Sequence, residues 1–292
     1  MRILSCKKSK GAFFFFFLVL QSDFGYSDGA VSAMQGVAFG VDKNLPIFNL
    51  THDIPPYDVW EASYRLTQTL GYWPEGTVFV SVVDPGVGSD RASVVAKTVK
   101  GQFVVTPDNG TLTHLHKTIG LESVRIIDET KNRLPGSGHS YTFHGRDIYA
   151  FTGARLAAGV IDYEGVGPLV EPFKIVELDT VEPVVGKGKV SGTIDALDVR
   201  YGSLWTNIPR VTTEQAGIEY GDVVQISICH NTNPVHTSNL RYVHSFSEVH
   251  VGESLMYVNS LDNLAIAINR GSFSRAFQVE HGPHWSITVA KQ

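Results

Sequence analysis

Short apolar runs alternate with amphipathic stretches along the first half of the chain, as strands and helices alternate in an α/β domain. Helical spacing of apolar residues predicts helices that begin near Asp28 and near Asp58, and a third from Arg146 to Ala158. Continuous apolar or β-branched runs predict strands at 13–21, 47–50, 76–83, 102–106 and 124–127. This rhythm predicts a doubly wound, mostly parallel sheet.

The pattern changes beyond Gly165, where helical spacing gives way to short strands broken by Gly, Asn and Pro. Many short strands without helices between them are typical of a small all-β barrel or sandwich. Such strands are expected at 188–194, 222–228 and 254–259. We therefore expect an N-terminal α/β domain over 1–170, a linker over 171–185, and a C-terminal all-β domain over 186–292.

The first twenty residues have two interpretations. Lys7, Lys8 and Lys10 precede the apolar run 13–20, which is the order of charged and apolar residues in a targeting segment. The run is much shorter than the roughly 20 residues of a membrane span. The chain also continues into Gln21 without a small-residue cleavage site. We favour a buried strand in a cytoplasmic protein with no membrane partner, and an exported protein is the alternative.

Composition excludes several classes of protein. The chain has 24 Lys and Arg against 29 Asp and Glu and no basic stripe, so we expect no nucleic-acid partner. Hydrophobic residues make up 43% and charged residues 18%, which excludes an intrinsically disordered chain. Cys6 and Cys229 are too few for a disulfide scaffold or a Cys-rich zinc module. His114 and His116 would point apart on a helix, with no evident third ligand, so no metal is expected.

Aspartates recur where the predicted strands end. In an open α/β sheet the ligand crevice lies outside the carboxyl ends of the strands, so acids there are candidates for a binding site. Aspartate is also a common turn and cap residue, so each of them alone has a purely structural interpretation. The acids follow the five predicted strands in chain order: Asp23, Asp53, Asp84, Asp108 and Asp128.

The loop after the third predicted strand has a more specific pattern. Pro85, Gly86 and Gly88 favour a tight loop, and Arg91 follows Asp84 by seven residues, so the loop can fold Arg91 back onto Asp84. A guanidinium beside a carboxylate keeps that carboxylate ionised and in one orientation. The pattern therefore predicts either a reactive carboxylate or a structural salt bridge.

His144 lies just before the third predicted helix, in the string from Ser140 to Asp147. Its aromatic neighbours Tyr141 and Phe143 suit either a catalytic pocket or a buried structural histidine. The order His-Gly-Arg-Asp is similar to a kinase catalytic loop. No glycine-rich phosphate loop accompanies it in this chain, which argues against a kinase.

Six motifs together resemble one known family. They are Ser22-Asp-Phe-Gly25, Thr51-His-Asp-Ile-Pro55, Asp84-Pro-Gly-Val-Gly88 with Arg91, Thr106-Pro-Asp-Asn-Gly110, Phe143-His-Gly-Arg-Asp147 and Trp205-Thr-Asn-Ile208. From Ser22 to about Gly271, the sequence resembles the adenosine-forming S-adenosylmethionine (SAM) hydrolases, or SAM hydroxide adenosyltransferases, relatives of the SAM-dependent fluorinase and chlorinase. The resemblance implies an N-terminal α/β domain and a C-terminal β-barrel. It also implies a homotrimer that binds SAM between one subunit's first domain and its neighbour's second.

The resemblance implies roles for single residues. Asp84, Arg91 and His144 match the water-handling residues of the family. Asp23 matches the acid that holds the ribose hydroxyls, and Tyr57 matches an aromatic residue that packs on the ribose. SAM is the substrate, so no separate cofactor is expected. The full set implied to bind the substrate is Asp23, Asp28, Tyr57, Phe143, Gly145, Asp198, Tyr201, Ser203 and Ser260.

One stretch departs from the pattern of the family. The family usually has Phe-Gly-Asn where this chain has Tyr201, Gly202 and Ser203. Asp198 and Ser203 fall in the stretch that the resemblance assigns to the ammonium and carboxylate of methionine. A serine offers a hydroxyl but no amide group. We therefore expect this protein to bind the methionine part less tightly, or through a different set of contacts.

The implied reaction is displacement at C5′ of the ribose, in which water attacks and methionine leaves as a neutral thioether. A free Asp carboxyl has a pKa near 3.9 and water near 15.7, so forming hydroxide in advance would cost roughly 16 kcal/mol. The base must therefore hold the water and accept its proton as the C–O bond forms. The sequence leaves Asp84 and His144 both open as the final acceptor.

Two alternatives to hydrolysis stay open: SAM or adenosine binding without turnover, and SAM-dependent halogenation. The fluorinase has a tyrosine where this chain has Asp84, and an extra loop soon after. The expected hairpin 92–106 leaves no room for that loop. An anionic carboxylate at the reacting carbon would also repel a halide. Both features favour water as the nucleophile.

Overall fold

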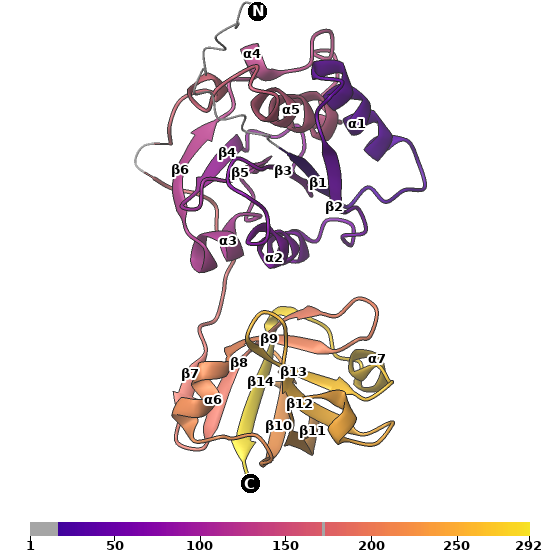
Figure 1. Ribbon diagram of the computed structural model, residues 1–292, viewed down its shortest axis with the longest axis vertical. Helices are drawn as coiled ribbons and strands as arrows, with labels where there is room; N and C mark the ends of the chain where they lie inside the picture. Colours follow the sequence, from indigo (N-terminus) through magenta and orange to yellow (C-terminus); the bar gives the residue numbers. More distant parts are fainter. Residues whose placement is uncertain (1–16, 171–172) are drawn as a thin grey trace, which may run out of the picture. The chain divides into compact units, whose positions relative to one another are not determined.

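The computed structural model describes residues 17–170 and 173–292 (Figure 1). The chain divides into two compact units, the first ending at Glu177 and the second beginning at Leu178. The division falls within 171–185, where the sequence predicts a linker. Residues 13–16 of the first predicted strand lie outside the described residues, as does Cys6. Among the helices of the described part, none has the length and apolar character needed to cross a membrane.

The first unit is built on a six-stranded sheet in the order β2-β1-β3-β5-β4-β6. Parallel pairing joins β1 to β2 and β3, and β3 to β5. Only β4 runs against its neighbours, because it forms a hairpin with β5. The strands are β1 (Leu18–Ser22), β2 (Ile47–Thr51), β3 (Val78–Val82), β4 (Ser93–Thr98), β5 (Phe103–Pro107) and β6 (Leu121–Ile126). This confirms the predicted mostly parallel α/β sheet.

Helices cover both faces of this sheet (Figure 1). Leu18 and Leu20 of β1 pack in one apolar core with α1 (Ala30–Val41) and α5 (Phe151–Ala157). The residue between them, Val19, packs in a second core with α2 (Val59–Leu70) and α3 (Thr113–Thr118). Alternate residues of a strand point to opposite faces, so a central strand with both faces covered is apolar throughout.

The helix predicted from Arg146 to Ala158 is not one continuous α-helix. It begins as a π-helical segment, η1 (Gly145–Ala150), and continues as α5. The backbone carbonyl of Asp147 accepts a hydrogen bond from the N–H of Leu134, at 2.7 Å, which ties η1 to the chain just after α4 (Glu129–Asn132). Such a connection is not visible in the apolar spacing of the sequence, and π-helical turns often occur near functional sites.

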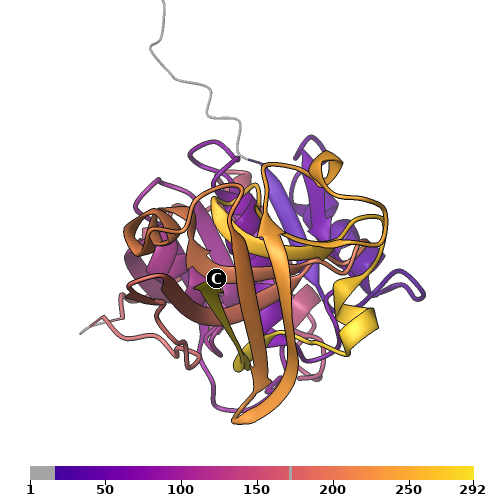
Figure 2. The same ribbon diagram turned by 90° about the horizontal axis from the view of Figure 1, so that it is seen from below.

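The second unit is a closed antiparallel-rich barrel. Seven strands close through pairing of β14 with β8, and β7 adds an edge strand beside β8. The long hairpin of β10 and β11 is visible in Figure 2. The strands are β7 (Val184–Gly186), β8 (Lys189–Leu197), β9 (Leu204–Pro209), β10 (Val223–His230), β11 (Asn233–Tyr242), β12 (Ser254–Val258), β13 (Asn263–Ile268) and β14 (Gly282–Lys291). The predicted C-terminal β-barrel is thus confirmed.

The barrel encloses one large apolar core, to which its strands contribute alternate inward-facing residues. Short helices lie between the strands: α6 (Arg210–Ala216), α7 (Phe273–Phe277) and a turn of 3₁₀-helix at Phe246–Glu248. The chain around α7 and around the 3₁₀ turn carries polar and aromatic residues that line a pocket of this unit.

Candidate active site

A pocket of about 280 Å³ lies in the first unit, beyond the carboxyl ends of β1 and β3. Four segments meet there: the loops after β1, β2 and β3, and the start of η1. The lining residues are Asp23, Phe24, Pro56, Tyr57, Val82, Asp84, Val87, Thr142, Phe143, His144 and Gly145. The position agrees with the general rule that ligands bind at strand carboxyl ends in open α/β sheets.

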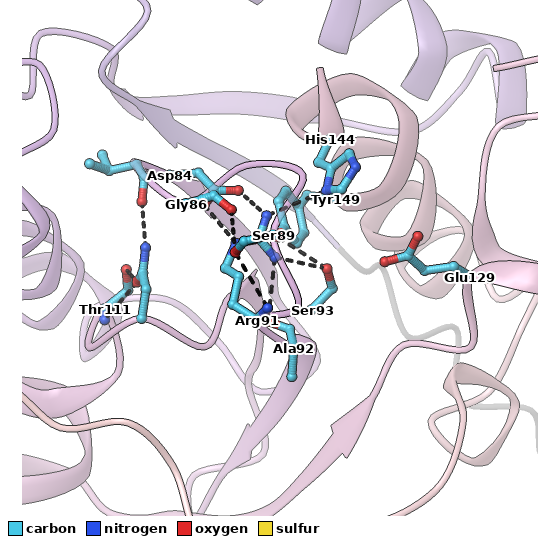
Figure 3. A network of polar contacts seen from close by, with 12 residues as sticks. Asp84, Gly86, Ser89, Arg91, Ala92, Ser93, Thr111, Glu129, His144 and Tyr149 are labelled. Atoms are coloured by element: carbon cyan, nitrogen blue, oxygen red, sulfur yellow. Dashed lines mark hydrogen bonds and ion pairs between the residues drawn. The ribbon is translucent and has the colours of Figure 1, made fainter. Parts of the chain in front are cut away.

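Asp84 and Arg91 form a bidentate ion pair at this pocket (Figure 3). Arg91 Nε donates to Asp84 Oδ1 at 2.7 Å, and Arg91 Nη2 donates to Asp84 Oδ2. The side chain of Arg91 is 11% exposed and that of Asp84 is 6% exposed, so water screens the pair weakly. The fold-back of the loop from Asp84 to Arg91 is thus confirmed, and the carboxylate is fixed in one orientation.

Further contacts hold the guanidinium of Arg91 from behind. Arg91 Nη1 donates to Ser93 Oγ at 3.2 Å, and that hydroxyl lies 3.1 Å from the hydroxyl of Tyr149 (Figure 3). The guanidinium also lies 5.7 Å from the centre of the Tyr149 ring. Burial raises the pKa of Tyr149, so its hydroxyl stays protonated at neutral pH. Neither Ser93 nor Tyr149 is marked as a site residue by the sequence.

His144 is buried, at 4% exposure, between two guanidinium groups. Its Nδ1 lies 3.4 Å from Arg91 Nη2, and its Nε2 lies 3.4 Å from Arg133 Nη2. Burial is the main cause that lowers the pKa of His144 from 6.5. The carboxylate of Glu129 opposes this shift, and the charges of Arg133 and Arg91 add to it. His144 is therefore neutral at physiological pH.

Asp23 and Tyr57 are joined by a hydrogen bond from the backbone N–H of Tyr57 to Asp23 Oδ2, at 2.9 Å. Tyr57 has a left-handed backbone, with φ of 70°, which costs a non-glycine residue about 1–3 kcal/mol. The hydrogen bond from Asp23 helps to hold that conformation. The ring of Tyr57 is 73% exposed at the pocket edge, where it can pack on a bound ligand.

A buried histidine fixes the loop that carries Asp23. His52 Nδ1 lies 2.7 Å from Ser22 Oγ, and His52 Nε2 lies 3.0 Å from Asn49 Oδ1. Because Asn49 Oδ1 only accepts, Nε2 carries the ring proton and Nδ1 accepts from the hydroxyl of Ser22. The backbone carbonyl of His52 also accepts from the N–H of Gly25 at 2.7 Å. Burial lowers the pKa of His52 to about 4, which keeps this arrangement neutral.

A second pocket, of about 830 Å³, lies in the barrel unit. Three of the predicted residues, Asp198, Tyr201 and Ser203, come together there. Asp198 Oδ1 accepts hydrogen bonds from the backbone N–H groups of Arg200 and Tyr201, which fixes the turn. The other lining residues are Arg200, Phe246, Tyr257, Ile268, Asn269, Arg270, Gly271 and Ser272. Aromatic rings beside arginine and small polar groups suit a planar, polar ligand.

Family models for the two units match this chain. Residues 18–167 match the SAM hydroxide adenosyltransferase N-terminal domain, and residues 192–286 match the SAM hydroxide adenosyltransferase C-terminal domain. The chain belongs to the SAM hydroxide adenosyltransferase family.

Individual relatives agree with this assignment over nearly their whole length. A Methanocaldococcus jannaschii protein named (R)-S-adenosyl-L-methionine hydrolase is 30% identical, over 90% of this chain and 92% of its own. A protein of the same name from Thermus thermophilus is 34% identical, over 89% and 95%. A protein from Actinoplanes sp. named fluorinase is 28% identical, over 94% and 97%.

A solved structure supports the fold. The crystal structure of an uncharacterized conserved protein from Thermotoga maritima superposes on this SAM hydroxide adenosyltransferase family member with a TM-score of 0.85. The two chains are 30% identical, and the match covers 94% of this chain and 100% of the other.

Some residues that the family resemblance places at the substrate lie outside both pockets. Asp28 is exposed at the start of α1, where its Oδ1 accepts from the backbone N–H of Ala30 at 2.9 Å. Ser260 is exposed in the turn between β12 and β13. These two assignments stay predictions.

The five strand-end aspartates separate into two groups in this family member. Asp23 and Asp84 line the first pocket, whereas Asp53, Asp108 and Asp128 do not. Asp128 Oδ1 accepts from the N–H of Thr130 and caps α4, and Asp108 Oδ1 accepts from the N–H of Val176. The cap interpretation holds for Asp128, whereas Asp108 joins its loop to a segment 68 residues further along the chain.

The two histidines considered for a metal have other contacts. His114 is buried, with Nδ1 2.9 Å from Ser63 Oγ. His116 Nδ1 lies 2.7 Å from Glu177 Oε1 at the surface. Within residues 17–170 and 173–292, no group of three or more His, Cys, Asp or Glu is placed to hold a metal ion.

Sequence reasoning missed several residues that shape the two pockets. Arg133 contacts His144 from a distance of eleven residues along the chain, and no motif marks it. In the barrel unit, Phe246, Tyr257 and Arg270 line the pocket without having been predicted. The available signal is the turn Asn269-Arg270-Gly271 directly after an apolar strand, a common position for ligand contacts.

Proposed function

We propose that this protein hydrolyses S-adenosyl-L-methionine to adenosine and L-methionine, with water attacking C5′ of the ribose. The observation that carries the proposal is the pocket in which an ion-paired Asp84 and a buried, neutral His144 face Asp23. Relatives named (R)-S-adenosyl-L-methionine hydrolase, 30–34% identical over about nine-tenths of the chain, support it.

Asp23 is suited to hold the two hydroxyls of the ribose. An ionised carboxylate offers about four lone-pair sites, so Asp23 can accept from both hydroxyls and keep its bond to Tyr57. The exposed ring of Tyr57 would pack on the sugar, and Phe143 would close the pocket beside the reacting carbon. The ribose would then be fixed with C5′ towards Asp84.

For this reaction, the position of the attacking water matters more than the strength of the base. The water oxygen forms the new bond to C5′, and the C5′–S bond breaks with its electron pair going to sulfur. Sulfonium becomes a neutral thioether, so the leaving group needs no proton. Asp84, fixed by Arg91, accepts a hydrogen bond from the water and holds it in line with C5′ and sulfur. Asp84 takes the proton from the water as the C–O bond forms, which avoids free hydroxide.

We also propose that the protein acts as a homotrimer in which SAM spans the first pocket of one subunit and the barrel pocket of its neighbour. The two pockets have complementary linings. The first has carboxylates for a ribose, and the barrel pocket has Asp198, Ser203, arginine and aromatic side chains for the charged groups of methionine and a planar base. Sedimentation at assay concentration tests the assembly. A fully active monomer would contradict it.

Halogenation is the second candidate, because relatives named fluorinase match over most of the chain. The carboxylate of Asp84 in the pocket argues against it, since a negative charge repels chloride or fluoride at the reacting carbon. The hairpin of β4 and β5 follows Arg91 after one residue, which leaves no space for an inserted halide loop.

The test is to incubate the protein with SAM in the presence of chloride or fluoride and to separate the products by chromatography. Adenosine and methionine in equal amounts, at a rate independent of halide, is the expected result. A 5′-halogenated nucleoside would favour the halogenase. Saturable SAM binding with no product would favour a binding protein without turnover.

A further inference from the structure

His144 lies between two cations, one on each ring nitrogen. Arg91 Nη2 is 3.4 Å from Nδ1, and Arg133 Nη2 is 3.4 Å from Nε2. The guanidinium of Arg91 is neutralised by Asp84, and that of Arg133 by Glu129, whose Oε2 accepts from Arg133 Nη2 at 2.8 Å. The histidine therefore sits between two ion pairs that come from different parts of the chain.

The segment that carries Glu129 and Arg133 is firmly anchored. The side chain of Asn132, which is fully buried, donates to the backbone carbonyls of Gly165 and Val166 at 3.1 and 2.9 Å. The next residue but one, Leu134, donates its N–H to η1, the segment that begins directly after His144. Arg133 is thus held beside the imidazole by buried backbone contacts on both of its sides.

The hydrogen-bond donors and acceptors around His144 favour the neutral form of its imidazole ring. A guanidinium only donates hydrogen bonds, and a neutral imidazole has one accepting nitrogen. One of the two approaches can therefore be a hydrogen bond, and the other brings a cation close to an N–H. A protonated imidazole has no accepting nitrogen and would add a positive charge between the two guanidiniums, which is unfavourable.

We propose that Arg133, oriented by Glu129, is a positioning residue that fixes the imidazole ring of His144 and holds it in the neutral form. The inference rests on the proposed function for its consequence: SAM carries a sulfonium, and a protonated His144 would place a further cation in the same pocket. Arg133 does not line that pocket, so its effect on the reaction would pass through His144.

Charged and titratable groups surround His144 and shift its pKa in opposite directions. Asp84 and Arg91 come from the loop after β3, Glu129 and Arg133 from α4 and its end, and Tyr141 from the segment before η1. Glu129 raises the pKa of His144, whereas Arg133 lowers it. Removal of one member of the pair should therefore move the titration of His144 in the opposite direction to removal of the other.

The direct experiment is an NMR titration of the full chain with isotope-labelled histidine, in which His144→Asn identifies the signal among 11 histidines. Arg133→Gln should raise the pKa of His144 by about one unit, and Glu129→Gln should lower it. Arg133→Lys keeps the charge and should stay near the wild-type value. Arg155→Gln is the matched control, because Arg155 donates to Lys131 and Asn132 of the same helix but does not face His144.

The same variants give a second readout in the pH profile of kcat/KM for SAM. The acidic limb should move to higher pH in Arg133→Gln and to lower pH in Glu129→Gln. If neither variant changes the titration of His144, or if both move it in the same direction as a loosened structure would, the role of Arg133 is wrong. Absence of SAM turnover in the wild type would reject the proposed function, while the NMR titration would still decide the role of Arg133.

Discussion

Arg91 holds Asp84 through two hydrogen bonds, from Nε to Oδ1 and from Nη2 to Oδ2. The bonds use one lone pair on each carboxylate oxygen and leave others for a water or a substrate. Since Arg91 is itself held by Ser93, the plane of the carboxylate is fixed before any ligand arrives. A water bound to Asp84 would therefore meet C5′ of a bound ribose from one direction only.

Asp84→Asn should lower kcat by about 10²- to 10⁴-fold, the range of general-base contributions, with little change in KM. The amide keeps the size of the side chain but loses the negative charge that orients Arg91 and accepts the proton of water. Steady-state kinetics with SAM measures both constants. A wild-type kcat would show that Asp84 is not the base, and His144 would become the candidate.

Asp23→Ala should instead raise KM by about 10- to 100-fold, because the ribose hydroxyls are present in the ground state. Asp53→Ala is the matched control, since Asp53 also follows a strand but does not line the pocket. Calorimetric titration with SAM checks the affinity of both variants. Equal loss of affinity in the two would mean that Asp23 has no specific contact with the ribose.

The protein should become less stable at acidic pH, because His52, which supports the loop of Asp23, becomes protonated more easily in the unfolded chain. The pKa of His52 is lowered by burial to about 4 from the ordinary value of 6.5. A lowered histidine pKa gives stability that is complete above pH 6.5 and is lost as the pH falls towards 4. The loss from this group is about 3 kcal/mol.

His52→Gln tests this linkage, because glutamine can donate and accept hydrogen bonds but does not titrate. We expect the variant to be less stable at pH 7 and to lose less stability than the wild type between about pH 6.5 and 4. His114, whose pKa burial also lowers to about 4, is present in both proteins and cancels in the comparison. Urea unfolding at several pH values gives the free energies, and parallel pH curves would contradict the assignment.

Hydrolysis of SAM should be insensitive to chelators. The positive charge beside Asp84 comes from Arg91, and the leaving thioether needs no Lewis acid. The rate should be the same before and after treatment with EDTA and dialysis. Activity that disappears with the chelator and returns with zinc or magnesium would contradict this prediction.

Local signals in the sequence predict much of the fold. Asp58 caps α2, a helix that the sequence predicts to begin near this residue, and the continuous apolar run of β1 places alternate residues in two cores. The loop from Asp84 to Arg91 is also predictable, because glycines and a proline restrict it within a few residues. These features depend on neighbours in the chain.

What the sequence does not predict depends on residues far apart along the chain. Tyr149 and Arg133 reach the site only because η1 and α4 pack beside the loop after β3. The π-helical segment η1 is likewise joined to a distant part of the chain, through the hydrogen bond from Leu134 to Asp147. No periodicity encodes such contacts, since they arise when separate elements meet in the folded domain.

The most direct test of SAM hydrolysis at C5′ is to run the reaction in water enriched in oxygen-18 and to analyse the nucleoside by mass spectrometry. Attack of water on C5′ puts the solvent oxygen into the 5′-hydroxyl, so we expect adenosine that carries one oxygen-18 atom, together with unlabelled L-methionine. Adenosine without the label, or a labelled methionine or methanol in its place, would contradict the account.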